Sequence, residues 1–319
     1  MGKTAILFAG QGAQVVGMGK DFSEKFPMAQ ALFQKADDIL GYDLSKIIFE
    51  GPEEELTRTE HAQPAIFLIS WVAFSLLKEL VPQLCYEATA GLSLGELTAL
   101  TAADVFSFES GLTLVRKRGV YMQEACEETQ GRMAAVIGLD TELVREVCEQ
   151  AGVQIANLNC PGQLVISGET QKVINACALA RAKGAKRALP LAVAGAYHSP
   201  LMAGAQPKLR EALAETKTAS PRIDVISNVT ALPHEMGAET IAETLVKQVT
   251  SSVLFEDSLR YLTNNGFTRF IEVGPGTVLS GFLRRITKEV EILNVSDMAS
   301  LEKTISALKV YNKTTEKHE

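Results

Sequence analysis

Residues 86–103 have the sequence YEATAGLSLGELTALTAA, and this stretch decides the fold. Its first part, Tyr86 to Ala90, is a short apolar run typical of a buried strand. Gly91 to Gly95 then forms a glycine-bounded turn, and Glu96 to Ala103 has the pattern of a helix. Strand, sharp turn and helix in direct succession are one half of a parallel βαβ arrangement.

The N-terminal region repeats this order. Thr4 to Phe8 is a second apolar strand candidate, and Gly10 to Gly12 opens a glycine-rich turn after it. Helical patterns follow over Met28 to Leu40 and over Gln63 to Leu80. Further strands are expected at Asp224 to Asn228 and Arg269 to Val273. The repeated order predicts a large α/β domain built on a parallel sheet.

Residues 128–196 have a different pattern, in which strands and helices alternate as βαββαβ. This order is typical of a small ferredoxin-like subdomain. We therefore predict that residues 1–127 and 197–319 form the large domain and that 128–196 are inserted into it. The expected strands of the insert are Arg132 to Leu139, Gln154 to Leu158, Gln163 to Ser167 and Lys186 to Val193, and its expected helices are Thr141 to Ala151, capped by Asp140, and Gln171 to Lys183.

Composition and charge exclude several classes of protein. The chain has 319 residues, 46% of them hydrophobic and 22% charged, which is incompatible with intrinsic disorder. The net charge of −7 argues against nucleic-acid binding through bulk charge. Pro64 to Leu77, the longest apolar run, is too short for a membrane span and predicts a buried helix.

Targeting and cysteine patterns point to the cytoplasm. The apolar stretch Ala5 to Ala9 is too short for the core of a signal peptide. The five cysteines include no CxxC pair, which argues against a disulfide framework and against a metal site. We expect reduced thiols in the core of a cytoplasmic protein, followed by a polar tail from Asn312 to Glu319.

The glycine turn after the first strand does not match a nucleotide-binding motif. GxGxxG would need glycine where Val15 stands, and the GxxxxGK loop fails because Met18 follows Gly17. Two interpretations stay open for Gly10 to Gly12. The segment is either a plain tight turn or a turn that presents a backbone N–H to a developing oxyanion.

Gly91-Leu92-Ser93-Leu94-Gly95 is the only GxSxG sequence in the chain. Because a strand candidate precedes it and a helix candidate follows it, Ser93 is a candidate nucleophile on an elbow, as in an α/β-hydrolase-like domain. Side chains at the two glycines would be expected to crowd the serine hydroxyl. The N–H of Leu94 is a candidate oxyanion donor at the start of the helix. A plain Gly-Ser turn is the alternative.

A serine nucleophile needs a base, and histidine is the usual one near neutral pH. His318 lies in the polar tail, His234 is expected in an exposed loop, and His61 precedes a helix, where it caps or packs. His198 stands where the insert rejoins the large domain, which suits a base that faces a cleft between them. A loop histidine without a catalytic role is the alternative.

Taken together, these segments resemble the malonyl-CoA:acyl carrier protein transacylase family. The resemblance covers about residues 3 to 296. The motifs that carry it are Phe8 to Gln14, Thr59 with Gln63 to Ala65, Gly91 to Glu96, Arg118-Gly119 with Met122-Gln123, Asn159 with Pro161 to Gln163, His198 to Met202, and Glu272 to Gly276.

The resemblance implies a Ser93–His198 dyad and an O-malonyl-serine intermediate. It implies that the backbone amides of Gln11 and Leu94 form the oxyanion hole and that the main-chain carbonyl of Gln248 orients His198. Arg118 would bind the free carboxylate of malonate, for which a guanidinium fork is suited. From the sequence alone, Arg118 would instead be one solvated charge in a basic run.

The resemblance also implies that Met122 and Asn159 contact the substrate. Leu92 stands where the family commonly has histidine, which we expect to tune the site without removing a dyad member. Ala196-Tyr197-His198 resembles the malonyl-type pattern, with tyrosine in place of phenylalanine. This resemblance implies malonate, and methylmalonate is the alternative. No permanently bound cofactor is implied, because malonyl-CoA and the phosphopantetheine of holo acyl carrier protein are substrates.

The expected partner is acyl carrier protein, and the expected oligomeric state is a monomer. Because carrier protein is acidic, docking needs basic residues, and the candidates are Lys183, Lys186 and Arg187, or Arg284 and Arg285. Solvated surface charges are the alternative for each. The expected function is malonyl transfer in fatty-acid biosynthesis. A trans-acting acyltransferase of a polyketide synthase, a serine esterase and a non-catalytic module that binds carrier protein are the other hypotheses.

Overall fold

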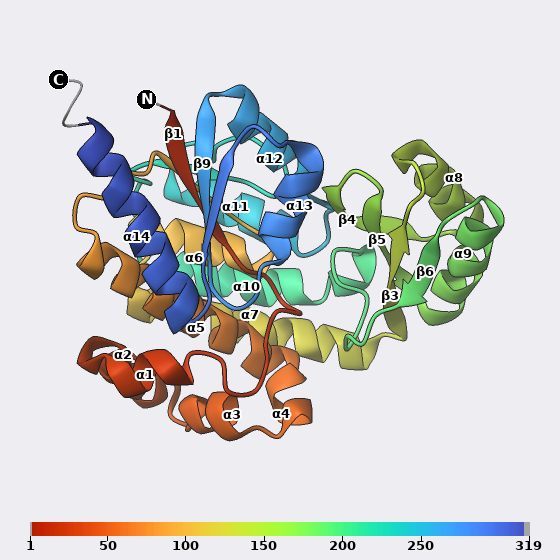
Figure 1. The fold of residues 1–319 in the computed structure, drawn as a ribbon. Coiled ribbons are helices and arrows are strands. Elements are labelled where there is room, and N and C mark those ends of the chain that lie inside the picture. Colours follow the sequence, from red (N-terminus) through yellow and green to blue (C-terminus); the bar gives the residue numbers. More distant parts are fainter. Residues whose placement is uncertain (1, 316–319) are drawn as a thin grey trace.

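A computed structural model describes residues 2–315 of the chain, and it contains two sheets that lie side by side (Figure 1). The first sheet has the strand order β10-β9-β1-β2-β7, and every pair in it is parallel. Its strands are β1 (Lys3–Phe8), β2 (Ala88–Gly91), β7 (Asp224–Ile226), β9 (Phe267–Val273) and β10 (Glu291–Val295). The predicted parallel sheet is therefore present.

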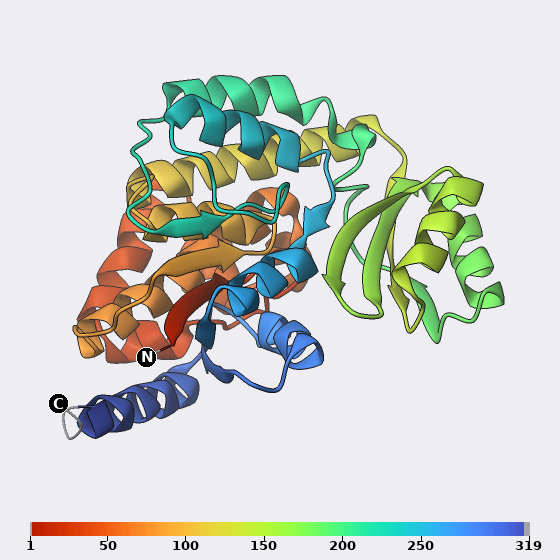
Figure 2. The same ribbon diagram turned by 90° about the horizontal axis from the view of Figure 1, so that it is seen from above.

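Both faces of this sheet are covered by helices, as a parallel sheet requires (Figure 2). Ile6 and Phe8 of β1 belong to a large apolar cluster on one face, while Ala5 and Leu7 belong to a second cluster on the other. The helices of the large body are α1 (Lys20–Lys25), α2 (Pro27–Leu40), α3 (Leu44–Glu50), α4 (Glu53–Thr57), α5 (Thr59–Leu80), α6 (Leu94–Ala102), α7 (Phe108–Glu128), the short 3-10 helix η1 (Pro200–Met202), α10 (Ala205–Glu215), α11 (Ala238–Gln248), α12 (Phe255–Asn264), α13 (Val278–Ile286) and α14 (Met298–Thr315).

Helix α5 contains the long apolar run Pro64 to Leu77. Among the described helices it alone is long and apolar enough to cross a membrane, and 72% of its most apolar window is buried inside the structure. It packs against α7 in the core. The prediction of a buried helix is confirmed.

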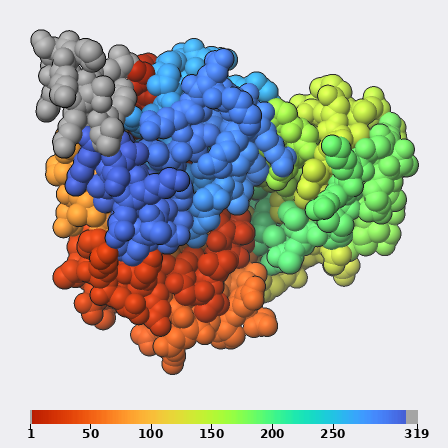
Figure 3. Space-filling model, viewed as in Figure 1, coloured from red at the N-terminus to blue at the C-terminus, as the bar shows by residue number. Residues whose placement is uncertain are grey.

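The second sheet forms the separate lobe on the right of Figures 1 and 3. Its elements follow in the order β3 (Gly131–Ile137), α8 (Thr141–Ala151), β4 (Gln154–Cys160), β5 (Gln163–Glu169), α9 (Thr170–Ala182) and β6 (Arg187–Pro190). These strands are antiparallel, in the order β6-β3-β5-β4. Asp140 caps α8 as predicted, since its side chain accepts a hydrogen bond from the N–H of Glu142 at 3.0 Å.

One strand of the second sheet comes from outside the insert. The two residues of β8 (Val253–Leu254) pair in parallel with Asn157 and Leu158 of β4. The large body thus contributes the fifth strand of the second sheet, which the sequence analysis did not predict.

Two sequence expectations need correction or fall partly outside the described residues. Cys126, Cys148, Cys160 and Cys177 are buried as expected, but Cys85 is exposed because it lies in the loop before β2. The expected polar tail from Asn312 begins within α14, and its last residues, 316–319, lie outside the described part of the chain.

Two helical glycines give a matched test of how the large body is packed. A Cβ at Gly95 in α6 would lie 2.3 Å from the main-chain oxygen of Phe8, whereas a Cβ at Gly281 in α13 would have nothing within 4 Å. Gly95→Ala is expected to lower the melting temperature, because main chain must move. Gly281→Ala is expected to raise stability by about 0.5–1 kcal/mol, as for glycine in a helix interior. Equal effects of the two substitutions on thermal unfolding would contradict this packing.

Candidate active site

Ser93 lies between the end of β2 and the start of α6. Its backbone has φ 54° and ψ −101°, a conformation that side-chain-bearing residues rarely adopt. Gly91 and Gly95 were expected to keep space free around the serine hydroxyl, but their main role in the structure is different. A Cβ at Gly91 would lie 2.0 Å from the main-chain carbon of Gly95, so these glycines let backbones pack together and do not primarily clear space for the hydroxyl.

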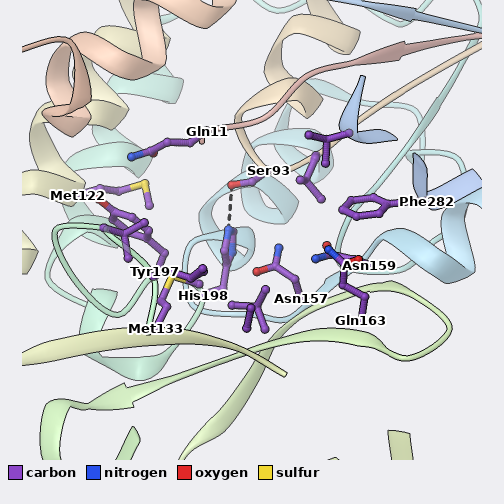
Figure 4. A pocket seen from close by; sticks show the side chains of 16 residues that line it. Gln11, Ser93, Met122, Met133, Asn157, Asn159, Gln163, Tyr197, His198 and Phe282 are labelled. Carbon is purple, nitrogen blue, oxygen red and sulfur yellow. Dashed lines mark hydrogen bonds between the residues drawn. The ribbon is translucent and has the colours of Figure 1, made fainter. Parts of the chain in front are cut away.

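The turn after β1 packs directly on the Ser93 turn. The N–H of Leu92 donates to the carbonyl oxygen of Phe8 at 3.2 Å, and a Cβ at Gly10 would lie 2.4 Å from the oxygen of Leu92. Gln11 therefore lies beside Ser93 (Figure 4). Within residues 2–315, neither the N–H of Gln11 nor the N–H of Leu94 has a hydrogen-bond acceptor. Both donors are free to bind an oxyanion.

The side chains of Ser93 and His198 meet in the pocket, as Figure 4 shows. Ser93 Oγ and His198 Nε2 are 2.8 Å apart, and His198 Nδ1 lies 2.8 Å from the main-chain oxygen of Gln248. A carbonyl oxygen only accepts hydrogen bonds, so Nδ1 carries the proton. Nε2 is then left with a lone pair toward the serine hydroxyl, which is the tautomer that a general base needs.

Burial keeps His198 neutral. The residue is only 4% exposed, and desolvation, followed by the positive charge of Arg118, lowers the pKa of the imidazole from 6.5 to about 4. The carbonyl of Gln248 acts in the opposite direction. His198 is therefore unprotonated at neutral pH. Its backbone, like that of Ser93, has a positive φ, 58°.

Arg118 projects from α7 to the same point. Its Nη2 donates to Ser93 Oγ at 3.1 Å and to Gln248 Oε1 at 2.9 Å, and its Nη1 donates to Gln63 Oε1 at 2.7 Å. The residue is 1% exposed, and burial lowers the pKa of the guanidinium to about 10, so it stays charged. No carboxylate of the described residues lies within 4.0 Å of it, and its Nε is buried without a partner.

Asn228 forms hydrogen bonds with the backbone of the Ser93 turn, and Glu96 binds Asn228 in turn. Neither role was predicted from the sequence. Asn228 Oδ1 accepts from the N–H of Ser93 at 2.6 Å, and Asn228 Nδ2 donates to the oxygen of Gly91 at 2.8 Å. Glu96 Oε2 accepts from the N–H of Asn228 at 3.0 Å and from Gln248 Nε2 at 2.6 Å. Glu96 directly follows the GxSxG motif, in the segment Gly91 to Glu96 that carries the family resemblance, but nothing in the sequence marked Asn228 as a site residue.

The expectation that His234 is exposed is wrong. It is 8% exposed, and its Nε2 lies 2.6 Å from Glu96 Oε1, an ion pair when the imidazole is protonated. The loop that follows β7 folds back on itself, with the N–H of His234 donating to the oxygen of Val225. Loop composition suggested exposure, but the partner on α6 lies 138 residues away in the sequence.

The other histidines do not enter the site. His61 lies in the first turn of α5, with Nδ1 3.1 Å from the oxygen of Glu55, so it packs at a helix start as expected. His318 lies outside the described residues. Within residues 2–315 no group of three or more histidine, cysteine, aspartate or glutamate side chains is arranged to hold a metal ion.

A cavity of about 240 Å³ opens over the dyad, between the large body and the second sheet. Met122 and Tyr197 lie at one end near Gln11, and Asn159, Gln163 and Phe282 lie at the other (Figure 4). The cavity is lined by Gln11, Leu92, Ser93, Met122, Met133, Ala135, Asn157, Asn159, Gln163, Val165, Leu191, Val193, Tyr197, His198, Val278 and Phe282. Met122 and Asn159, predicted as substrate-binding, are both in its wall.

The basic residues considered for docking fall into two places. Lys183, Lys186 and Arg187 lie on the insert, where Lys183 pairs with Glu146 at 2.7 Å. Arg284 and Arg285 lie on α13, whose Phe282 lines the cavity. Arg285 donates to the cavity residue Gln163 at 2.8 Å. The α13 pair thus lies on a helix that forms part of the cavity wall.

Comparison with known proteins agrees with this geometry. Residues 6–315 match the model of the acyl transferase domain. A Bacillus subtilis protein named malonyl CoA-acyl carrier protein transacylase is 44% identical over 98% of this chain and 99% of its own. The crystal structure of the protein of that name from Clostridium perfringens superposes with a TM-score of 0.93, at 38% identity over 98% and 99% of the two chains.

A further solved structure is a type II PKS acyl-carrier protein in complex with its malonyl-transacylase. The transacylase is 38% identical to this chain and has a TM-score of 0.91, covering 96% of this chain and 99% of its own. With a serine–histidine pair, a buried arginine and this likeness over nearly the full length, the chain belongs to the acyl transferase domain family and, within it, to the malonyl-CoA:acyl carrier protein transacylases.

Proposed function

We propose that this enzyme moves a malonyl group from coenzyme A to the phosphopantetheine thiol of acyl carrier protein, with Ser93 as nucleophile. One observation carries the choice of malonyl. Arg118 is a buried cation held only by neutral groups, beside the dyad. Because an unpaired buried charge is costly, a substrate carboxylate that completes its ion pair binds strongly there.

In the first half-reaction, Ser93 Oγ attacks the thioester carbonyl while His198 Nε2 takes its proton. The N–H groups of Gln11 and Leu94 stabilise the oxyanion of the tetrahedral intermediate. Its collapse breaks the C–S bond, and the leaving thiolate of coenzyme A receives the proton from His198. The product is an O-malonyl ester on Ser93.

The second half-reaction reverses these steps with a different thiol. The phosphopantetheine thiol gives its proton to His198 and attacks the ester carbonyl, and the oxygen of Ser93 leaves and regains the proton. Thioester and oxyester are close enough in energy for transfer in both directions when water is excluded. Malonyl-loaded carrier protein supplies chain extension, and fatty-acid biosynthesis is the pathway we propose.

Other contacts bear on the choice of substrate. Tyr197 is held by a hydrogen bond of 2.5 Å between its OH and Thr59 Oγ1, so it narrows the end of the cavity near Met122. We propose malonate over methylmalonate on this ground. Asn159 lines the cavity, where its side-chain amide can form a hydrogen bond with an amide of pantetheine.

The esterase hypothesis is less well supported. An esterase on this elbow would normally orient its histidine with a carboxylate. Here His198 Nδ1 is bound by the main-chain oxygen of Gln248. A buried guanidinium beside the serine would also have no use in the hydrolysis of neutral esters.

We also propose a domain organisation, a docking site for carrier protein, a cellular location and an oligomeric state for the enzyme. The antiparallel strand order β6-β3-β5-β4 supports a ferredoxin-like subdomain over residues 128–196, inserted into an α/β-hydrolase-like domain. Arg284 and Arg285 are proposed as the docking site of carrier protein. Five free cysteines support a reducing, cytoplasmic location, and a monomer that needs no bound cofactor is proposed.

Ser93→Ala is expected to abolish covalent malonylation, because no other group would take the acyl chain at the dyad. Intact-mass measurement after mixing with malonyl-CoA tests this. Cys85→Ala, which removes the exposed thiol, is the control and is expected to label like the unmodified protein. A malonyl adduct that persists on the Ser93 variant, or one that disappears with Cys85, would contradict the assignment.

Arg118→Ala is expected to lower kcat/KM for malonyl-CoA by at least about 100-fold, equivalent to about 3 kcal/mol for a lost buried charge partner. Transfer from acetyl-CoA, which has no free carboxylate, is expected to be spared. Steady-state kinetics with the two thioesters measures the ratio. The same loss with both acyl groups would mean that Arg118 has only a structural role.

The pH dependence of acylation follows from the low pKa of His198. The base works when it is neutral, so activity falls only as the pH drops toward about 4, and kcat/KM for malonyl-CoA is expected to be flat between pH 8 and pH 6. Burial and the charge of Arg118 are the two causes of the low pKa of His198, and Arg118→Gln removes the second. The acidic limb of the pH profile of kcat/KM, measured with acetyl-CoA, is therefore expected to move to higher pH. A limb near pH 6.5 in the unmodified enzyme would refute the assignment of a buried base.

A further inference from the structure

Four polar side chains of the large body form a buried cluster behind the dyad: Glu96, Asn228, His234 and Gln248. The exposed fraction of each is 8% or less. They come from three separate segments, namely α6, the loop that follows β7, and the last residue of α11. The reaction proposed above uses only the main-chain oxygen of Gln248 from this cluster, so the burial of the other groups needs an explanation.

Gln248 is the member of the cluster that contacts His198, Arg118 and Ser93. Its main-chain oxygen accepts from His198, its Oε1 accepts from Arg118, and its Nε2 donates to the main-chain oxygen of Ser93 at 3.0 Å. A side-chain amide has donors on one nitrogen and lone pairs on one oxygen. It can therefore hold Arg118 only in one of its two orientations, with Oε1 toward the guanidinium.

Glu96 selects that orientation. Its Oε2 lies 2.6 Å from Gln248 Nε2, and an ionised carboxylate can only accept hydrogen bonds. If the amide were reversed, the oxygen of Gln248 would face the carboxylate of Glu96, and two acceptors would meet. Its nitrogen would face the guanidinium of Arg118, and two donors would meet. The charge of Glu96 also acts on Arg118, since it raises the pKa of the guanidinium against the larger lowering by burial.

His234 holds the other oxygen of the carboxylate. Its Nε2 lies 2.6 Å from Glu96 Oε1, while Asn228 and Gln248 share Oε2. With both oxygens occupied, the carboxylate cannot rotate, so its position relative to Gln248 is fixed. The three hydrogen-bond partners of the carboxylate offset the free-energy cost of removing it from water.

From these contacts we propose that Glu96 is a positioning residue for malonyl selection, and that His234 is the side chain that holds it in place. Glu96 orients the amide of Gln248, and that amide orients the guanidinium of Arg118 toward the acyl group on Ser93. The inference rests on the proposed function, because it concerns how Arg118 meets a malonyl carboxylate.

Replacement of Glu96 has a general and a specific consequence. The general one arises through Asn228, which links Glu96 to the N–H of Ser93, and it lowers kcat for every acyl group. The specific one arises through Gln248 and Arg118 and raises KM for malonyl-CoA alone. The ratio of kcat/KM for malonyl-CoA to that for acetyl-CoA therefore isolates the positioning role.

The test compares Glu96→Leu, Glu96→Gln and a matched control. Glu96→Leu is expected to lower the malonyl-to-acetyl ratio at least 10-fold, mainly through KM for malonyl-CoA. Glu96→Gln keeps an oxygen toward Gln248 if its amide nitrogen faces His234, and it is expected to restore most of the ratio. Glu272→Leu removes another buried carboxylate, one that binds the N–H groups of Leu279 and Ser280, and it is expected to leave the ratio unchanged.

His234→Ala keeps the test open if Glu96→Leu does not fold, since it removes only the loop side chain that binds Oε1. It is expected to lower the same ratio about 3-fold or more. Equal losses for the two acyl groups, or an unchanged ratio in the Glu96 and His234 variants, would overturn the proposal. A wild-type enzyme with no malonyl label on Ser93 would instead reject the proposed function itself.

Discussion

The site depends on one electrostatic constraint, a guanidinium that is buried and charged but touches no carboxylate of the described residues. Arg118 is held by the amides of Gln63 and Gln248 and by the hydroxyl of Ser93. Neutral hydrogen bonds fix its direction without neutralising it. An unmatched positive charge therefore lies next to the hydroxyl of Ser93, and an acyl group with a terminal carboxylate is the ligand that we propose for it.

The same charge acts on the base. Together with burial, it disfavours protonation of His198, so the imidazole is unprotonated at neutral pH, as the proposed reaction requires of its base. A substrate carboxylate bound to Arg118, as proposed above, would reduce this effect. In the proposed mechanism, the low proton affinity of His198 and the selection of a substrate carboxylate therefore both originate in Arg118.

Much of the fold could be predicted because its signals are local. The strands before the two glycine turns, the buried helix α5 and the helix Thr141–Ala151 each follow from a pattern within about twenty residues. Helix α7 was missed because Arg118 occupies its buried side, so that a basic run interrupts the apolar periodicity. The two-residue strand β8 is too short to give a pattern at all.

The site was predictable only in part. Ser93 follows from its motif, and His198 was the candidate left after the other histidines were set aside, but Arg118 and Gln248 needed the resemblance to a family. Asn228 and His234 escaped both approaches, because their partners are 132 to 138 residues distant and an ordinary loop sequence carries them. Contacts of this kind are set by tertiary structure, which short-range patterns do not encode.

Strand β8 belongs to the large body but pairs with the second sheet, and this limits how residues 128–196 can be exchanged between relatives. Val253 and Leu254 follow Gln248 closely and form a main-chain ladder with Asn157, which lines the cavity, and with Leu158. A chimaera that exchanged only residues 128–196 between relatives would have to re-create this pairing with a foreign strand. We expect a chimaera that also exchanges residues 253–254 to keep the β4–β8 pairing. Without that pairing, β4 would shift and the cavity residue Asn157 would be displaced.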